Sequence, residues 1–286
     1  MENPLFSIIV TAYNRELFIG ETLESISAQS FQNYELIVSD DCSTDKTYAL
    51  AESYRTRFQG MRISRNESNL GQFRNRNYAA SLATGEYILY VDSDDTIKAG
   101  TLQYLADIVK EHEDIGFFII NKLPASDSYL TFTPRQAYVQ HFYKKSILHI
   151  GPGGTLIKRK LFEQIGGFPL CYGVVGDMYY NLLAAAHTNI LLLDFDFLNY
   201  RRHEGQEINK KNEYLIYGYT YFNDILSRPD GPLTTHEKTA LINKSKRRFL
   251  INCFHDAFHN KSLKFFFHAL ETVKFNFTDY IKAVFA

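Results

Sequence analysis

Tyr87-Ile88-Leu89-Tyr90-Val91-Asp92-Ser93-Asp94-Asp95 is the stretch of sequence that decides the fold. Its first five residues are of strand-forming type, and three carboxylates follow within four positions. Carboxylates packed this closely repel one another, so a cation, a proton or an array of donors must neutralise them. Asp92 and Asp94 would share one face of an extended backbone. A hard divalent ion that also holds phosphate oxygens suits such a site, and a solvated acidic turn is the alternative.

The chain around this stretch alternates short apolar runs with amphipathic segments. The expected strands are 5–11, 34–39, 61–64 and 87–91, and the expected helices are 16–29, 47–58 and 73–82. This alternation is typical of right-handed βαβ units, so we expect a largely parallel sheet with ligands beyond the carboxyl ends of its strands. Polar loops at 12–15, 40–41 and 92–95 follow three of the strands, and the fold would gather them at one rim.

The second half of the chain continues this rhythm to about residue 204. The patterns there predict a helix at 102–109, strands at 115–120, 146–150 and 196–202, a helix that begins at Asp177, and a loop at 124–134. From Gly205 onward the rhythm stops, and helices are expected at 214–226 and within 234–281. The chain should therefore end in a helical extension.

The last part of this extension is basic and aromatic. Between Lys238 and Ala286, nine Lys or Arg stand against three Asp or Glu, and ten aromatic residues are interleaved with them. Helices of this composition can lie on a membrane surface. Alternatively, their apolar faces pack on the main domain or on a second subunit, which would make the protein a homodimer.

Composition and charge exclude several classes of function. The 286 residues carry a net charge of −1 with a pI of about 6.8, so no overall field favours nucleic acid. Three cysteines without metal-like spacing fit a reducing compartment better than a disulfide framework. The amino terminus has no basic region before its apolar run, and no run approaches the ~18 apolar residues of a membrane span. We therefore expect a cytoplasmic protein that meets a membrane only at its surface.

Several motifs, taken in order, resemble family 2 glycosyltransferases of the GT-A fold, which move sugars from nucleotide donors. The matching segments are Ser7 to Asn14, Ile37 to Asp45, Asn69 to Gly71 with Arg76-Asn77, Thr84 to Ile88, Asp92 to Asp95, and Gly166 to Phe168 before Asp177. They are similar to the family's nucleotide loop, its Asp-Asp-Gly-Ser-x-Asp motif, the segment that leads to its DxD, the DxD itself, and the segment before the catalytic Asp. Two departures stand out: Gly176 precedes Asp177 where the family commonly has Glu, and Cys42 replaces the glycine of Asp-Asp-Gly-Ser.

The resemblance covers roughly residues 5–202 and implies the organisation of the chain. The fold would be α/β of the GT-A (Rossmann-like) type, a mostly parallel sheet flanked by helices. Residues 1–204 would form the glycosyltransferase domain, with a nucleotide-binding half at about 1–97 and an acceptor-binding half at about 98–204. Residues 205–286 would form the C-terminal helical extension.

The resemblance implies a set of nucleotide-binding residues. Asp41 would accept a hydrogen bond from the base with Asp40 beside it, and Asp92 would hold the ribose. Arg76 would face the base or the diphosphate. The full set is Thr11, Tyr13, Asn14, Arg15, Asp40, Asp41, Arg76, Asp92 and Ser93. Helix capping by Asp40 or Asp41 and a solvated Arg76 are the alternatives.

The resemblance also implies the groups that carry the chemistry. Asp94, Asp95 and His203 would hold Mn²⁺ or Mg²⁺, which offsets the charge on the diphosphate leaving group. Asp177 would be the general base that takes the proton of the acceptor hydroxyl as it attacks C1, with inversion of the anomeric centre. A structural histidine and an aspartate that merely complements a helix dipole are the alternatives for His203 and Asp177.

Glycines near the expected acceptor side complete the predicted site. Gly153, Gly154 and Gly176 have no side chains and would let an acceptor approach the backbone closely.

As a whole, the resemblance implies a metal-dependent inverting glycosyltransferase of surface polysaccharide synthesis. Its partners would be a nucleotide-sugar donor, with UDP favoured, and a saccharide or lipid-linked acceptor, and no nucleic acid. It would work in the cytoplasm or at the inner face of the cell membrane. A sugar-nucleotide-binding protein without catalysis is one alternative. A haloacid-dehalogenase-type phosphatase is another, because Asp92 to Thr96 fits Asp-x-Asp-x-Thr, with Asp92 as nucleophile and Asp94 as acid/base.

Overall fold

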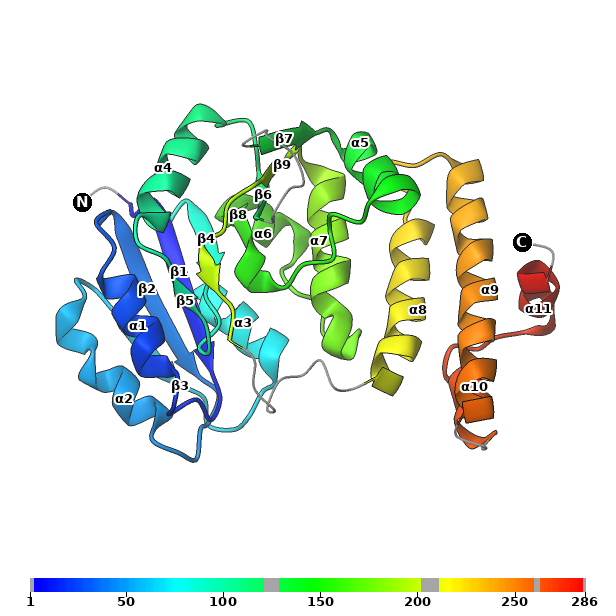
Figure 1. The fold of residues 1–286 in the computed structure, drawn as a ribbon, viewed down its shortest axis with the longest axis horizontal. Helices are drawn as coiled ribbons and strands as arrows, with labels where there is room; N and C mark the ends of the chain where they lie inside the picture. The colour runs from blue at the N-terminus through cyan, green and yellow to red at the C-terminus, as the bar shows by residue number, and fades with distance from the viewer. Residues whose placement is uncertain (1–2, 121–128, 202–210, 260–262, 285–286) are drawn as a thin grey trace.

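An eight-stranded sheet forms the centre of the molecule (Figure 1). The computed structural model describes residues 3–120, 129–201, 211–259 and 263–284. In sheet order, the strands are β3 (Arg62–Arg65), β2 (Tyr34–Asp40), β1 (Phe6–Ala12), β4 (Tyr87–Tyr90), β8 (Thr155–Lys158), β6 (Phe117–Ile120), β9 (Ile190–Leu193) and β7 (Tyr129–Phe132). β8 runs antiparallel to β4 and β6, β7 runs antiparallel to β9, and the other neighbours are parallel. The predicted mostly parallel sheet is confirmed.

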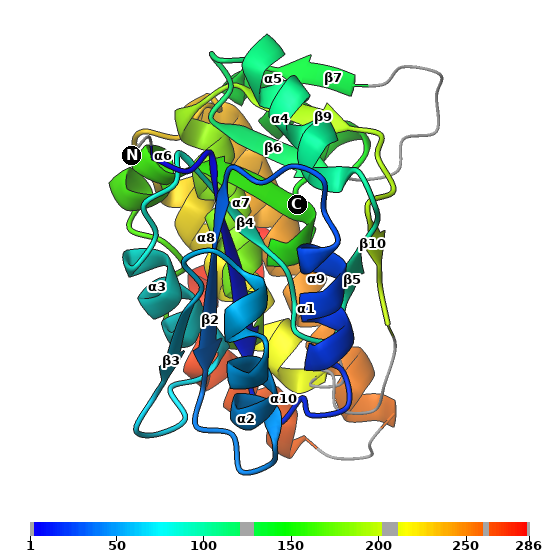
Figure 2. The ribbon, with the colours of Figure 1, turned by 90° about the vertical axis from the view of Figure 1, so that its left-hand side faces the viewer.

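Helices cover both faces of this sheet, and Figure 2 shows α1 and α3 on opposite sides of it. One face carries α1 (Ile19–Ser27), α2 (Thr47–Ser53) and α4 (Thr101–Glu111), and the other carries α3 (Gln72–Ser81), α5 (Pro134–Val139), α6 (Arg159–Ile165) and α7 (Gly176–His187). Ile8 and Val10 of β1 pack into the first layer, whereas Ile9 packs into the second. Because both faces are buried, β1 is a continuous apolar run without alternation.

The C-terminal helices pack outward from α7 in succession (Figure 1). They are α8 (Lys211–Ser227), α9 (Thr235–His259), α10 (Lys264–Thr272) and α11 (Phe277–Val284). α8 contacts α7, α9 contacts α8, and α10 and α11 contact α9. Tyr221 and Ile225 of α8 belong to the core of the main sheet, while Phe249, Cys253 and Phe266 form a separate cluster farther out. The predicted helices are confirmed, and the predicted boundary at residue 204 lies outside the described residues.

The prediction of a strand at 146–150 is wrong, because the backbone N–H and C=O groups of this segment form hydrogen bonds with side chains instead of with a neighbouring strand. The N–H groups of Ile147 and Leu148 donate to Nδ1 of His141 at 3.2 and 3.1 Å. Asn181 Nδ2 donates to the carbonyl oxygens of Leu148 and Ile150 at 3.0 and 2.7 Å. His141 itself belongs to a π-helical turn, η2 (Gln140–Lys144).

Three further differences concern strands at the edges of the fold. The predicted loop at 124–134 contains β7, whose exposed residues have no buried face that a pattern could reveal. Its partner β9 is a short apolar run that the sequence analysis did not assign. Of the predicted strand at 196–202, residues Leu198–Asn199 form β10, which pairs with β5 (Thr96–Ile97) in a small antiparallel sheet.

Candidate active site

The loops that follow β1, β2 and β4 meet at one edge of the sheet. The N–H of Asn14 donates to Oγ of Ser43 at 2.9 Å, which joins the first two loops. Nε of Arg15 donates to Oδ2 of Asp94 at 3.1 Å, which joins the first loop to the third. The predicted gathering of three polar loops at one rim is confirmed. Asn14 turns the first loop with a φ of 52°, a conformation that asparagine adopts more readily than most residues.

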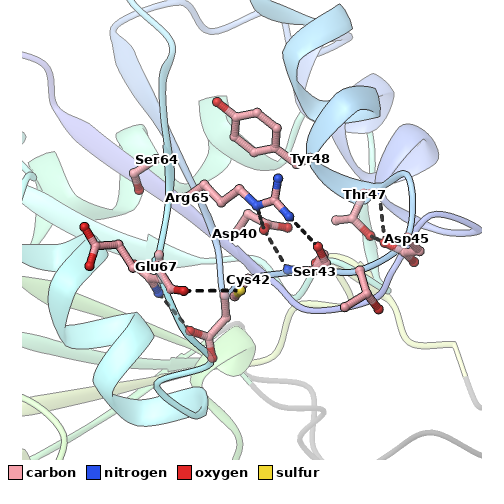
Figure 3. A network of polar contacts seen from close by, with 12 residues as sticks. Asp40, Cys42, Ser43, Asp45, Thr47, Tyr48, Ser64, Arg65 and Glu67 are labelled. Carbon is pink, nitrogen blue, oxygen red and sulfur yellow. Dashed lines mark hydrogen bonds and ion pairs between the residues drawn. The ribbon is translucent and has the colours of Figure 1, made fainter.

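The carboxylate of Asp40, at the end of β2, is buried beneath this rim (Figure 3). Its Oδ2 accepts a hydrogen bond from the N–H of Ser43 at 2.9 Å and lies 3.5 Å from Nε of Arg65. Arg65 also donates to the carbonyl oxygen of Ser43 at 2.7 Å and lies over the ring of Tyr48. Among the described residues, Asp40 Oδ1 has no hydrogen-bond partner. Asp40 therefore orders the loop through one oxygen and keeps the other as an unmatched acceptor.

Cys42 shows why the family has glycine at its position. Its φ of 65° lies in the left-handed region, which costs a residue with a side chain roughly 1–2 kcal/mol. The Sγ atom lies 3.7 Å from the carbonyl oxygen of Glu67 (Figure 3). The backbone at Cys42 thus keeps the left-handed conformation that glycine adopts most readily.

Asp41 holds the loop that leads into α3. Its Oδ1 accepts from Nδ2 of Asn66 and from the N–H of Leu70, both at 2.8 Å. Its Oδ2 accepts from the N–H of Gly71, the residue before α3, at 2.9 Å. The side chain therefore anchors a helix approach, close to the capping alternative. Its contact with a nucleotide base stays a prediction.

Arg76 and Asp92 form an ion pair below the rim. Nη2 of Arg76 lies 2.6 Å from Oδ1 of Asp92, and Arg76 is 8% exposed. Nη1 of Arg76 also donates to Oε1 of Gln72 at 3.2 Å, one helical turn away. The alternative of a solvated helical arginine is therefore wrong. The pair places a fixed positive charge beside the start of the acidic stretch.

Asp94 and Asp95 lie in different environments at the end of that stretch. Asp94 pairs with Arg15, as described above, whereas Asp95 is 2% exposed and accepts a hydrogen bond from the N–H of Arg201 at 3.0 Å. Burial raises the pKa of Asp95 to about 6, the Arg201 N–H opposes this, and the carboxylates of Asp92 and Asp94 raise it further. An added cation would relieve this repulsion.

These carboxylate oxygens have the chemistry that Mg²⁺ and Mn²⁺ prefer. Within the described residues, no group of three or more His, Cys, Asp or Glu side chains is close enough to form a metal site. Asp92 and Asp94 each pair with an arginine instead. His203 lies outside the described residues. Asp94 and Asp95 fit a metal by their donor type and by their mutual repulsion, and metal binding stays a prediction.

Asp177 lies in the first turn of α7, within electrostatic reach of the Arg76–Asp92 pair. Burial raises the pKa of Asp177 to about 6. The N–H of Met178, which donates to Oδ1 at 2.9 Å, and the charge of Arg76 lower the pKa, while Asp92 raises it. A carboxylate with this pKa is ionised at neutral pH and accepts a proton more readily than an ordinary aspartate. Its pKa therefore suits a general base, and this role of Asp177 stays a prediction.

The three predicted glycines have different surroundings. A Cβ on Gly153 would stand 3.5 Å from Oδ2 of Asp92, whereas one on Gly154 would collide with the side chain of Ile150 at 2.4 Å. A Cβ on Gly176 would stand 2.7 Å from the ring of Phe73. Packing therefore excludes the glutamate that the family commonly has before the catalytic Asp, which explains this departure.

The remaining predicted residues lie in or near the rim. Thr11 is part of β1 and pairs with Ser39 of β2. Tyr13 is 43% exposed at the rim, whereas Ser93 is 5% exposed. The carbonyl oxygen of Ser93 accepts from Oγ1 of Thr22 at 3.0 Å. Nucleotide contacts of these side chains stay predictions.

Sequence reasoning missed residues that lie far away along the chain. Oγ1 of Thr22, on α1, donates to the carbonyl oxygen of Asp95 at 2.7 Å and fixes the acidic loop from below. Tyr221, on α8, is influenced electrostatically by Asp177, and its hydroxyl lies 3.1 Å from Nε2 of His149. The sequence around Thr22, inside an amphipathic helix, and around Tyr221, in the helical extension, does not indicate that either residue lies near the site.

The sequence profile of glycosyl transferase family 2 matches residues 7–166. The poly(ribitol-phosphate) beta-N-acetylglucosaminyltransferase TarS of Staphylococcus aureus is 43% identical over 110 residues, which are 37% of this chain and 19% of TarS. The minor teichoic acid biosynthesis protein GgaB of Bacillus subtilis is 33% identical over 111 residues, which are 38% of this chain and 12% of GgaB. The matched part is thus a fifth or less of the length of these two relatives.

The fold resembles solved glycosyltransferase structures. Residues 1–349 of S. aureus TarS in complex with UDP-GlcNAc superpose with a TM-score of 0.69 and 22% identity, covering 98% of this chain and 78% of that one. The mannosyltransferase PcManGT of Pyrobaculum calidifontis, in complex with GDP-Man and Mn²⁺, superposes with a TM-score of 0.58 and 17% identity, covering 99% and 88% of the two chains. The expected GT-A fold is confirmed. No helix in the described ranges is both long enough and apolar enough to cross a membrane.

Proposed function

This chain belongs to glycosyl transferase family 2, and from that premise we propose that it moves a sugar from a UDP-sugar to a hydroxyl group of a saccharide or lipid-linked acceptor, with inversion of the anomeric carbon. The observation that carries this proposal is Asp177, whose pKa is raised to about 6 beside the Arg76–Asp92 pair. The family excludes the phosphatase alternative. The position of Asp177 argues against a binding protein without catalysis.

The donor would lie across the rim formed by the loops after β1, β2 and β4. The residues proposed to bind it, at the rim or just below it, are Thr11, Tyr13, Asn14, Arg15, Asp40, Asp41, Arg76, Asp92 and Ser93. Asp40 has an unmatched acceptor oxygen, and Arg76 brings a positive charge that suits a diphosphate. UDP is favoured because TarS, a relative in sequence and fold, has been solved with UDP-GlcNAc.

The metal would be Mn²⁺ or Mg²⁺ held by Asp94 and Asp95, with His203 as a third expected ligand. When bound, it supplies positive charge against the diphosphate leaving group. Arg15, which already pairs with Asp94, would remain close to the same phosphates. Arg201 and Thr22 fix the backbone of the acidic loop and so hold both carboxylates in place.

Asp177 would take the proton of the acceptor hydroxyl as that oxygen attacks C1 of the sugar. Attack from the face opposite the diphosphate inverts the anomeric centre. The bond from C1 to the diphosphate oxygen breaks as the bond to the acceptor oxygen forms, and the electron pair leaves with UDP. Above a pH of about 6 the carboxylate is ionised and ready for this step.

We propose the same division of the chain as the sequence implies. Residues 1–97 would bind the nucleotide, 98–204 would bind the acceptor, and 205–286 would be the helical extension. The named functions of TarS and GgaB favour an acceptor of the cell envelope, which would be met at the inner face of the membrane. Exposed aromatic residues on α9 and α10, among them Phe254, Phe258 and Phe267, suit contact with that surface.

A thermal-shift panel of nucleotide-sugars with and without Mn²⁺ tests the donor assignment. UDP-sugars should raise the melting temperature more than GDP- or dTDP-sugars, and Mn²⁺ should increase the shift. If no nucleotide stabilises the protein, the proposed function fails. Release of UDP in the presence of an acceptor, lost in Asp177→Asn, separates the enzyme from a binding protein.

A further inference from the structure

A hollow lies between the start of α7 and the helices of the C-terminal extension. Its volume is about 630 Å³, and its walls come from η2, the start of α7, α8 and α9. Val175 and Met178, which flank the Gly176-Asp177 pair, lie at its inner end. No step of the donor chemistry uses this space.

The wall of the hollow connects Asp177 with a positive charge on α9. Burial raises the pKa of Tyr221, Asp177 raises it further, and Arg248 lowers it, so both charges act on Tyr221. The hydroxyl of Tyr221 lies 3.1 Å from Nε2 of His149. Arg248 also lowers the pKa of His149, after burial, and therefore faces the same pair. Tyr221, His149 and Arg248 all line the hollow.

Two basic side chains of α9, Lys244 and Arg248, line this hollow, and Arg247 lines a second hollow beside it. Lys244, Arg247 and Arg248 are exposed, and none of them pairs with a carboxylate in the described part of the chain. Lys244 and Arg248 line both this hollow and a second one of about 620 Å³, so the two lie next to each other along α9. Lys246, on another face of the same helix, pairs instead with Asp279 at 2.6 Å.

We propose that this hollow is the acceptor subsite, and that Lys244, Arg247 and Arg248 bind a phosphate group of the acceptor while its hydroxyl reaches Asp177. The proposal rests on the proposed function and specifies that the acceptor carries a negative charge. Guanidinium and ammonium groups without carboxylate partners suit the oxygens of a phosphate. Because Val175 and Met178, on either side of the Gly176-Asp177 pair, line the hollow, its ligand is expected to be the acceptor rather than a flat lipid surface.

Two sources of phosphate share this chemistry: the phosphodiester of a polyol-phosphate chain and the diphosphate of a lipid-linked saccharide. The experiment measures transfer by the full chain, with one UDP-sugar, to three acceptors. These are a polyol-phosphate oligomer, a polyprenyl-diphosphate-linked saccharide in detergent, and a neutral oligosaccharide of matched length. Preference for either phosphate-bearing acceptor identifies the source, and equal use of the neutral acceptor overturns the proposal.

Arg248→Ala and Lys244→Ala test the residues. Each should raise KM for the phosphate-bearing acceptor about tenfold, the equivalent of one charge-assisted hydrogen bond, with a smaller change in kcat. Arg248→Lys should restore part of the loss, and added salt should weaken acceptor binding. Lys110→Glu, an exposed lysine on α4, is the matched control and should change nothing. Unchanged KM in both alanine variants overturns the proposal.

Direct binding keeps the two proposals separate. Equilibrium binding of a labelled polyol-phosphate oligomer, measured without donor, should weaken in Arg248→Ala while the affinity for UDP stays the same. If UDP binds but the oligomer does not, and the lipid-linked saccharide does not bind either, the acceptor subsite is wrong and the proposed function survives. If UDP does not bind, the proposed function fails, whatever the oligomer does.

Discussion

Arg76 and Asp92 lie 2.6 Å apart, and this ion pair acts on Asp177 with both of its charges. Arg76 lowers the pKa of Asp177 and Asp92 raises it, in addition to the larger effect of burial. One ion pair thus joins the expected ribose contact to the expected base. Burial mainly sets the pKa of Asp177, and the Arg76–Asp92 pair adjusts it.

Asp177→Asn removes the base and leaves the donor rim intact. We expect kcat to fall about 10²–10⁴-fold, the usual contribution of a positioned general base, with unchanged affinity for UDP. Steady-state release of UDP and calorimetric titration with UDP measure the two quantities. Asp107→Asn, on the exposed face of α4, is the matched control. Transfer at the wild-type rate in Asp177→Asn would show that another group is the base.

The pH dependence should follow the same carboxyl group. Because the pKa of Asp177 is raised to about 6, kcat should increase with pH below 6 and level off above it. The free energy of unfolding should change in the opposite direction and decrease as the pH rises. The folded pKa lies above the unfolded value, so ionisation costs stability as the pH rises from about 4 to about 6. Asp177→Asn should therefore be more stable than wild type at pH 7.5, on the order of 1–2 kcal/mol, and the difference should vanish near pH 4.

Arg76→Ala should move the acidic limb of the pH profile. Loss of the positive charge raises the pKa of Asp177 further and leaves Asp92 without its partner. The half-maximal pH of kcat should shift upward, and Arg76→Lys should restore part of the shift because it retains the charge. A full pH–rate profile of the three proteins checks this. An identical limb in Arg76→Ala would show that the ion pair does not tune the base.

Gly176→Ala tests the packing reason for the glycine before the base. Its Cβ would meet the ring of Phe73 at 2.7 Å, so the free energy of unfolding should fall by about 1–3 kcal/mol. Gly218→Ala, in α8, meets no atom within 4 Å and should be neutral or up to about 1 kcal/mol stabilising. Chemical denaturation of both variants measures the difference. Equal stabilities would remove packing as the cause of the departure from the family.

Asp94→Asn should weaken metal binding while the fold persists. Mn²⁺ should raise the melting temperature of the UDP complex in wild type, and this increase should be lost in the variant and in wild type treated with a chelator. Arg15, the partner of Asp94, can still donate to the amide oxygen, so the loop should keep its shape. A Mn²⁺-dependent shift of wild-type size in Asp94→Asn would place the ion elsewhere.

The parts of the fold that follow from the sequence are those fixed by local pattern. The apolar run of β1 and the carboxylates after β4 identify the sheet and its rim, because strand alternation and strand-end loops are short-range features. β7 was not predicted, because it is an exposed edge strand. No strand forms at 146–150, because the side chains of His141 and Asn181 make hydrogen bonds to the backbone there. Such long-range hydrogen bonds leave no periodic trace.

The candidate site divides in the same way. Asp92 and Asp177 could be assigned from motifs, and the structure brings both within electrostatic reach of Arg76. Tyr221 and Arg248 could not be assigned from the sequence. They belong to helices whose amphipathic pattern shows which face is buried but not which part of the protein that face packs against. The packing of α8 on α7 brings Tyr221 within electrostatic reach of Asp177, and the packing of α9 on α8 brings Arg248 within reach of Tyr221.

The reversed direction of β8 has a consequence for how this scaffold can diversify. Because β8 runs antiparallel to β4, its amino end lies at the same rim as the carboxyl end of β4, and Gly153 comes to lie beside Asp92. The turn that leads into β8 and the turn that follows β4 therefore lie at the same edge of the sheet. Insertions or deletions between residues 140 and 152 would alter the surface that we propose for the acceptor, while the register of β1 to β4 stays unchanged. Selectivity for the second substrate can thus evolve independently of the first.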